Sequence, residues 1–293
     1  MTNLELGFWS FPVLLLMIFL RAPIGLAMLL CGFGGWYLAM GGNPTPLLSK
    51  LKSETYTTFS SYSLSIIPMF LLMGQFATLS GMSQALFKAA ESFLGHRRGG
   101  VAMAAVGACA GFGAICGSSL ATAATMSKVA LPELRRYGYS GGFSTATLAA
   151  GGTLGILIPP SVILVIYAIL TEQNIAKLFL AAFLPGVLAA IGYVITISIY
   201  VRLNPKSAGV RPAVPMGDRF KALANTWPVL VIFFVVVGGI YLGWFTPTEG
   251  AAVGAAGTGL AALLAGSLNW AVLRESLMGT AKTTGMIFFI VLG

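Results

Sequence analysis

Hydroxyl side chains gather in two glycine-rich stretches of an otherwise strongly apolar chain. The first stretch contains Cys116, Gly117, Ser118, Ser119 and Thr122, and the second contains Gly152, Thr153, Gly155, Pro159, Pro160 and Ser161. Hydroxyls and freed backbone carbonyls are hard neutral oxygens, which suit a small alkali cation such as Na⁺. We therefore treat both stretches as candidate parts of one ion and substrate site. Its candidate Na⁺ ligands are Ser118, Ser119 and Thr153.

The second stretch predicts a break in a membrane helix. Pro159 and Pro160 lack the backbone N–H that a continuous helix needs, and Ile158 before them is driven towards an extended conformation. Inside a bilayer, the freed backbone groups are tolerated only where protein or a water-filled cavity satisfies them. Such a break is a candidate ligand site. A simple proline kink would also explain the pair.

The first stretch lies within an Ala- and Gly-rich segment, Gly99–Ala130, that has basic residues at both ends. Because positive flanks stay in the cytoplasm, both ends are expected on the same side of the membrane. A re-entrant hairpin with Gly117-Ser118-Ser119 at its tip meets this condition. Two very short spans, or one kinked serine-rich helix, remain the alternatives.

The composition identifies an integral membrane protein. Of the 293 residues, 57% are hydrophobic and 9% are charged, whereas soluble domains carry about 25% charged residues. Apolar runs of roughly 17 to 25 residues predict membrane spans. Besides the hairpin and the broken helix, we expect spans over 4–20, 22–40, 62–79, 178–201, 226–245 and 250–268. An amphipathic helix is expected over Met82–Arg98, lying in the membrane interface.

The basic residues fix an orientation. Placing successive loops on alternate sides puts 14 of the 17 lysines and arginines on one side. That side holds Arg21, 82–98, the two hairpin ends, 202–221 and 269–284. The positive-inside rule makes it cytoplasmic and places the N-terminus outside. The net charge of +9 is thereby explained without nucleic acid.

An internal repeat is present. Residues 22–27 correspond to 246–251, and residues 66–74 correspond to 284–293. The first copy begins outside and the second inside, as in the inverted repeats of secondary transporters. We expect a complete second copy to contain a further hairpin and a further broken helix. The sequence therefore looks C-terminally truncated.

Other chemistries find little support. The predicted spans contain no internal Asp, Glu or His, which argues against a proton relay. The single His96 lies in a basic flank, and the three cysteines have no metal-binding spacing. We therefore expect the protein to hold no cofactor. We also expect that it is not an enzyme, because a nucleophilic Ser118 or Ser119 would need a nearby base. A channel is disfavoured, because it would need polar stripes along several helices rather than one hairpin and one break. For any single hydroxyl, close helix packing remains an alternative role.

Four segments together resemble one known family. They are Pro68–Gly74, Gly117–Thr122, Gly151–Ser161 and Phe245–Ala252. In this order they resemble the large membrane subunit of tripartite ATP-independent periplasmic (TRAP) transporters. The family's hairpin tip usually reads Ser-Gly-Ser-Ser, and here Cys116 replaces the first serine. A thiol is a poor Na⁺ ligand, so position 116 could offer only its carbonyl.

The resemblance implies a sodium-coupled elevator transporter of the bacterial inner membrane that imports C4-dicarboxylates or other organic acids. It also implies two partners, namely a small four-helix membrane subunit and a periplasmic solute-binding protein. Besides these, we expect contacts with membrane lipids and the organic acid, and none with nucleic acid. An ion-coupled anion transporter without a binding protein is the main alternative, and an intramembrane hydrolase is a remote one.

The expected fold is therefore all-α and polytopic, with inverted repeats, a re-entrant hairpin and a broken transmembrane helix. We divide it into scaffold helices of the first repeat, an amphipathic arm helix, a transport-domain hairpin with the broken helix, a connecting span with a cytoplasmic loop, and an incomplete second repeat. These divisions cover residues 1–80, 81–98, 99–171, 172–225 and 226–293.

Overall fold

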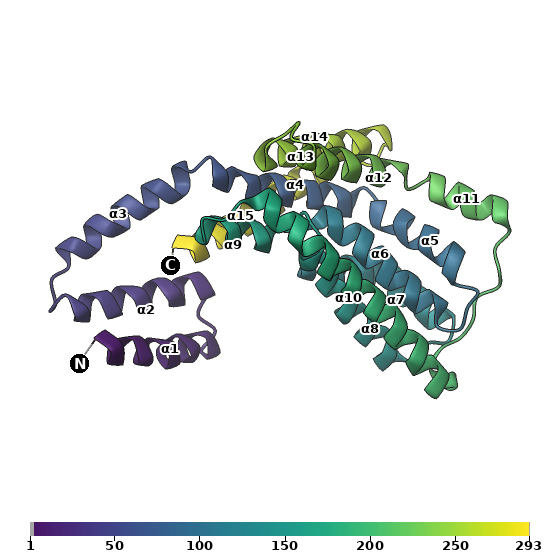
Figure 1. Ribbon diagram of the computed structural model, residues 1–293, viewed down its shortest axis with the longest axis horizontal. Coiled ribbons are helices and arrows are strands. Elements are labelled where there is room, and N and C mark those ends of the chain that lie inside the picture. The colour runs from purple at the N-terminus through teal and green to yellow at the C-terminus, as the bar shows by residue number, and fades with distance from the viewer. Residues whose placement is uncertain (1–2, 293) are drawn as a thin grey trace. The chain divides into compact units, whose positions relative to one another are not determined.

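A computed structural model describes residues 3–292, and this part of the chain folds into helices joined by turns, without a strand (Figure 1). The helices are α1 (Asn3–Phe19), α2 (Ile24–Ala39), α3 (Thr45–Ser60), α4 (Ile66–Leu79), α5 (Met82–Leu94), α6 (Gly100–Cys116), α7 (Ser119–Arg136), α8 (Gly141–Leu157), α9 (Val162–Leu170), α10 (Ile175–Leu203), α11 (Met216–Ala224), α12 (Trp227–Phe233), α13 (Gly239–Tyr241), α14 (Pro247–Leu264) and α15 (Trp270–Leu292). The all-α fold is confirmed.

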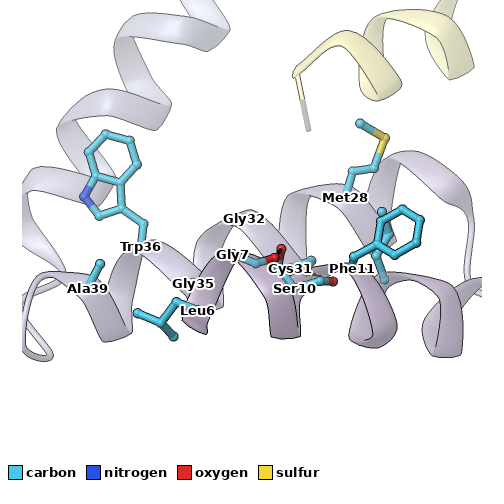
Figure 2. A pocket seen from close by; sticks show the side chains of 11 residues that line it. Leu6, Gly7, Ser10, Phe11, Met28, Cys31, Gly32, Gly35, Trp36 and Ala39 are labelled. Atoms are coloured by element: carbon cyan, nitrogen blue, oxygen red, sulfur yellow. Dashed lines mark hydrogen bonds between the residues drawn. The ribbon is translucent and has the colours of Figure 1, made fainter. Parts of the chain in front are cut away.

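The chain divides into two compact units, and the first comprises Met1–Ser65 with Ala281–Gly293. Within it, α1 packs against α2, and the Cys31 thiol donates a hydrogen bond to the Ser10 carbonyl at 3.1 Å. Small residues such as Gly7 and Gly32 leave a hollow of about 420 Å³ between the two helices (Figure 2). No charged side chain is among the residues that line this hollow.

The second unit, Ile66–Thr280, contains both glycine-rich stretches. Helices α6, α7 and α8 pack directly on one another, and α10 runs along α6 and α8 (Figure 1). Small residues permit this packing. A Cβ added at Gly151 of α8 would lie 3.0 Å from the Cys109 sulfur of α6. The core around them contains large, fully buried side chains such as Phe112 and Leu154.

Both ends of the α6–α7 hairpin lie against one segment, Ser207–Arg211, which we call the strap. The Arg211 N–H donates to the Gly95 carbonyl at 3.1 Å, just before the hairpin begins. The Ser140 N–H donates to the Ser207 carbonyl at 3.0 Å, just after the hairpin ends. The predicted helical hairpin is confirmed, with its two ends together and its turn at Gly117 and Ser118. The basic residues that flank the hairpin and Arg211 of the strap therefore lie at one end of this unit.

The predicted helix break is also confirmed. Helix α8 ends at Leu157, α9 begins at Val162, and the two axes are bent by 43°. The intervening residues 158–161 include a cis peptide bond between Pro159 and Pro160. Since these prolines offer no N–H, the Gly155 and Ile156 carbonyls lose their helical donors. The bend is therefore a change of direction with freed backbone groups and goes beyond a mild kink.

Several expected boundaries differ from the structure. Residues 41–61, between two expected spans, are mostly the helix α3. Residues 269–284 and 284–293 were treated separately, but the single helix α15 runs through both as far as Leu292. The expected loop 202–221 already contains the start of α11. The span predicted over 226–245 is interrupted by a π-helix at Phe234–Gly238 and ends at Tyr241. The functional divisions proposed from the sequence do not coincide with the two packing units and stay a prediction.

Among the described residues, α10 is long and apolar enough by itself to cross a membrane. The number rises to as many as four when helix pairs joined at a bend are each taken as one span, and α8 with α9 is one of these pairs. Helices α1, α2 and α6 are apolar but shorter.

The orientation predicts which loop residues an impermeant reagent reaches. Lys206 near the strap and Lys177 at the start of α10 are both exposed, and the charge distribution places them on opposite sides. We expect a cysteine at Lys206 to be protected from an impermeant thiol reagent applied to intact cells. A cysteine at Lys177 is the matched control and should be labelled. Labelling at Lys206 in sealed cells would reverse the orientation.

Candidate functional site

The hairpin tip lies directly against the helix break. Gly117 has φ +64°, a left-handed conformation that favours glycine, and its N–H closes α6 by donating to the Gly113 carbonyl at 2.8 Å. The Gly117 carbonyl then accepts a hydrogen bond from the Val162 N–H at 3.2 Å. The two irregular segments therefore face each other, as the sequence predicted, and the hairpin partly satisfies the backbone of the broken helix.

Two helix N-termini meet at this junction. Helix α7 begins after Ser118, and α9 begins after Ser161. Each serine hydroxyl accepts a capping hydrogen bond, from the Ala121 N–H at 3.4 Å and from the Leu164 N–H at 3.5 Å, respectively. Helix N-termini carry partial positive charge and unpaired N–H groups, and both favour an anion. The junction can therefore attract a carboxylate without any formal charge of its own.

Glycines on α8 allow the tip to approach this closely. A Cβ added at Gly155 would lie 2.6 Å from Thr122 Oγ1 and 2.8 Å from the Ser118 carbonyl oxygen. A Cβ at Gly152 would lie 2.6 Å from the Cβ of Ala123 on α7. Distances below 3.0 Å are steric clashes, so any larger residue would push the tip away from α8. Both glycines predicted for the site thus have a clear structural role.

Thr122 places an unsatisfied oxygen inside the junction. Its side chain is fully buried, and its hydroxyl has no hydrogen bond of ordinary geometry. The Cys116 thiol interacts with this hydroxyl, but a thiol is only a weak hydrogen-bond donor and acceptor. A buried hydroxyl without a partner carries a desolvation cost that a bound cation or water would relieve.

The donor set at the junction fits a monovalent cation better than a divalent one. Residues 99–127 and 141–171 contain no charged side chain. The described residues also hold no group of three carboxylate, imidazole or thiol side chains that could bind a metal ion. The available oxygens are those of hydroxyls and of carbonyls that the two prolines leave without donors.

Thr153 requires a correction. The sequence suggested that its hydroxyl shares a site with the tip, but Thr153 lies on an exposed face of α8. Its Oγ1 donates to the Ala150 carbonyl at 2.7 Å and shares a hydrogen bond with Tyr193 Oη of α10 at 2.9 Å. Successive helix residues are 100° apart, so the face that carries Gly152 and Gly155 turns Thr153 away. The structure therefore brings Thr122, and not Thr153, against Gly155 at the tip.

The remaining predicted residues lie at the junction with different exposures. Cys116, Gly117, Pro159, Pro160 and Ser161 are buried, whereas Ser118 and Ser119 are half-buried. Leu120, which follows them, is 83% exposed, so the start of α7 reaches the protein surface. The Ser118 and Ser119 hydroxyls can therefore meet a ligand that enters from outside the junction.

Three residues that contact the candidate site were not predicted from the sequence. A Cβ at Gly113 would lie 2.6 Å from the Gly155 Cα, and a Cβ at Gly74 of α4 would lie 3.0 Å from the Cys116 carbonyl oxygen. Gly113 lies in the Ala- and Gly-rich segment and Gly74 in the Pro68–Gly74 motif, so the sequence had already singled out both segments. Tyr193 had no such signal, since it is a single tyrosine within a long apolar helix.

Comparison with known proteins gives a consistent result. Residues 11–293 match the family described as "Tripartite ATP-independent periplasmic transporter, DctM component". The C4-dicarboxylate TRAP transporter large permease protein DctM of Pseudomonas aeruginosa is 37% identical over 243 residues, which cover 83% of this chain and 56% of the relative.

Two further relatives are named for other solutes. The ectoine TRAP transporter large permease protein TeaC of Halomonas elongata is 30% identical over 94% of this chain and 63% of its own length. The sialic acid TRAP transporter large permease protein SiaM of Vibrio cholerae is 31% identical over 80% of this chain and 54% of its own length. The chain thus spans 54–63% of the length of these three relatives.

The close approach at Gly155 predicts a stability difference between two alanine variants. Gly155→Ala should destabilise the protein by about 1–3 kcal/mol, because the new methyl group overlaps Thr122 and the Ser118 carbonyl. Gly142→Ala is the matched control on the same helix, since a Cβ there meets nothing within 4 Å. Thermal unfolding in one detergent compares the two variants. Equal melting temperatures would contradict the tight junction.

Proposed function

The chain belongs to the DctM-component family of tripartite ATP-independent periplasmic transporters, and from this membership we infer that it acts as part of the large membrane subunit of a sodium-coupled importer. The proposed substrate is a small organic acid, such as a C4-dicarboxylate. Relatives named for C4-dicarboxylate, ectoine and sialic acid differ in their solutes, so we propose only the class. The named relatives are permeases, which agrees with a transporter rather than an enzyme.

One observation supports this proposal most directly, namely the hydrogen bond from Val162 N–H to the Gly117 carbonyl. It joins the hairpin tip to the helix break, so that two helix N-termini and several neutral oxygens share one place. The N-termini suit the carboxylate of an organic acid. The hydroxyl and carbonyl oxygens suit Na⁺. An anion and a cation bound side by side would each lower the cost of binding the other, which is the physical basis of symport.

The residues take separate parts in this mechanism. Thr122 Oγ1 and the Ser118 and Ser119 hydroxyls are the proposed side-chain ligands of Na⁺, assisted by the carbonyls that Pro159 and Pro160 leave free. The capping serines Ser118 and Ser161 hold the two N-termini in place. We propose that the hairpin and broken helix move together as an elevator, because their close packing leaves them no independent motion.

Family membership supports the proposed partners and location. We propose a bacterial inner-membrane location, with the N-terminus periplasmic and the strap cytoplasmic, in agreement with the charge distribution. A periplasmic solute-binding protein would deliver the organic acid, and a small four-helix membrane subunit would complete the complex. A transporter working without a binding protein is the second candidate. An intramembrane hydrolase lacks support, since no base lies in the stretches that carry Ser118 and Ser119.

Reconstitution tests the proposed function. The complete transporter is placed in liposomes, and uptake of a labelled C4-dicarboxylate and of a labelled sialic acid is measured with the binding protein outside. We expect uptake of an organic acid only with an inward Na⁺ gradient and only with the binding protein. Uptake that persists without the binding protein would favour the second candidate. Uptake that follows a proton gradient without Na⁺ would exclude sodium coupling.

The ion ligands are tested by two small substitutions. Thr122→Val and Ser119→Ala each remove one proposed ligand while changing the volume little, and each should raise the Na⁺ concentration for half-maximal uptake about fivefold. Thr153→Val is the matched control, because its hydroxyl bonds Ala150 and Tyr193 instead. Unchanged Na⁺ dependence in both site variants would return these hydroxyls to a packing role.

A further inference from the structure

A second polar cavity lies at the strap end of the hairpin, away from the tip. It has a volume of about 350 Å³ and is enclosed by α5, α7, the strap and α11. Its charged lining residues are Lys88, Glu91, Glu133, Arg136, Arg211 and Asp218. We call it the arm pocket, because α5 is the predicted arm helix. Nothing in the proposed transport mechanism uses it.

Glu91 is the buried centre of the arm pocket. The residue is 5% exposed, and its Oε2 forms an ion pair with Arg211 Nη1 at 3.0 Å. Its Oε1 is also buried and has no hydrogen-bond partner. A carboxylate oxygen removed from water without a donor is costly, and one guanidinium contact does not satisfy all its lone pairs. Glu91 lines the pocket, so a donor-bearing ligand there would satisfy this acceptor once the carboxylate turns towards it.

The lining of the arm pocket holds three cations and three carboxylates, but Lys88 and Arg136 are exposed and Arg211 is the only one of the three cations that is not. Glu91 lies within the influence of Glu133, and the side chain of Glu133 is 34% exposed. The partner of Glu133, Arg136, is 3.6 Å away and points largely into solvent, with 71% of its side chain exposed. Arg211, whose side chain is 25% exposed, is the least exposed of the three cations that line the pocket, and its ion pair is with Glu91.

The pKa of Glu91 agrees with this imbalance. Burial raises the pKa of its carboxyl, Arg211 and more weakly Arg136 and Lys88 oppose the rise, and Glu133 adds to it. The charged carboxylate is thus insufficiently compensated where it stands. A cationic group beside Oε1 would remove the deficit.

The surroundings place the arm pocket at the level of lipid headgroups. Helix α11 lines the pocket with Asp218 and Ala222, while its other side exposes Met216, Phe220 and Leu223. Such a helix lies in the membrane interface with its apolar side towards the acyl chains. At the rim of the pocket, Lys88 and Arg136 are exposed and could meet a phosphate.

We propose that the arm pocket binds a primary ammonium group, with Glu91 Oε1 accepting one of its N–H donors and Glu133 supplying the second negative charge. The ammonium can come from a phosphatidylethanolamine headgroup, whose phosphate then meets Lys88 and Arg136, or from a soluble amine. A quaternary ammonium such as that of phosphatidylcholine has no N–H to donate and fits the unsatisfied oxygen poorly. The pocket is wide enough for a headgroup, and the described residues, its three carboxylates included, form no group that could hold a metal ion.

Native mass spectrometry of the purified chain in detergent tests this proposal. Phosphatidylethanolamine and phosphatidylcholine with the same acyl chains are added at equal concentration, and retained lipid is counted. We expect phosphatidylethanolamine to be retained about tenfold more, the effect of one charge-assisted hydrogen bond. Glu91→Gln and Glu133→Gln should each reduce this preference severalfold. Glu172→Gln, an exposed carboxylate outside the pocket, is the matched control and should keep it.

Glu91→Gln leaves Arg211 without its partner, so a loss of folding there would move the test to the partly exposed Glu133. Putrescine distinguishes the two sources. If it raises the melting temperature of lipid-free protein and fails to do so in Glu133→Gln, a soluble amine is a ligand. If only phosphatidylethanolamine binds with the expected preference, the lipid is the ligand. Equal retention of both lipids without a putrescine effect, or effects unchanged in both variants, would overturn the proposal and leave water as the occupant.

Discussion

Backbone groups that a membrane helix frees must be satisfied inside the protein, and the junction between tip and break meets part of this requirement. Pro159 and Pro160 interrupt α8, and the Val162 N–H of the following helix donates to the Gly117 carbonyl. That contact needs a left-handed glycine at position 117. It also needs α8 to come close to α7. Gly155 permits this approach, because the Cβ of any other residue at this position would overlap Thr122. The candidate site therefore follows from a backbone constraint.

The two ends of the α6–α7 hairpin differ in chemistry for the same physical reason. At the tip, deep within apolar sequence, only neutral hydroxyls and carbonyls are present, because an isolated charge would be too costly there. At the strap end, charged residues are tolerated, and Arg211 both bonds the Gly95 carbonyl and pairs with Glu91. One hairpin thus links a neutral junction at its tip to a charged region at its other end.

The comparison of prediction with structure shows where local signals fail. The tip at Gly117 and the break at Pro159 were predicted correctly, because glycine and proline act through their own backbone geometry. Thr153 was placed wrongly, since its hydroxyl pairs with Tyr193, a residue forty positions later. Residues 269–284 were placed on the basic side and 284–293 were matched to 66–74, but α15 runs through both segments as far as Leu292, because a helix can pass from one environment to another without a break.

The sequence alone determined the membrane class, the orientation signal, the hairpin, the broken helix and, through four motifs in order, the family. These features depend on composition, charge and residues whose backbone preferences are local. The tertiary structure decided which hydroxyls come together, so that Thr122 replaces Thr153 at the tip, and it revealed the buried pairing of Glu91 with Arg211. Such pairings join residues far apart in the chain, and their geometry is set by helix packing, which no local pattern encodes.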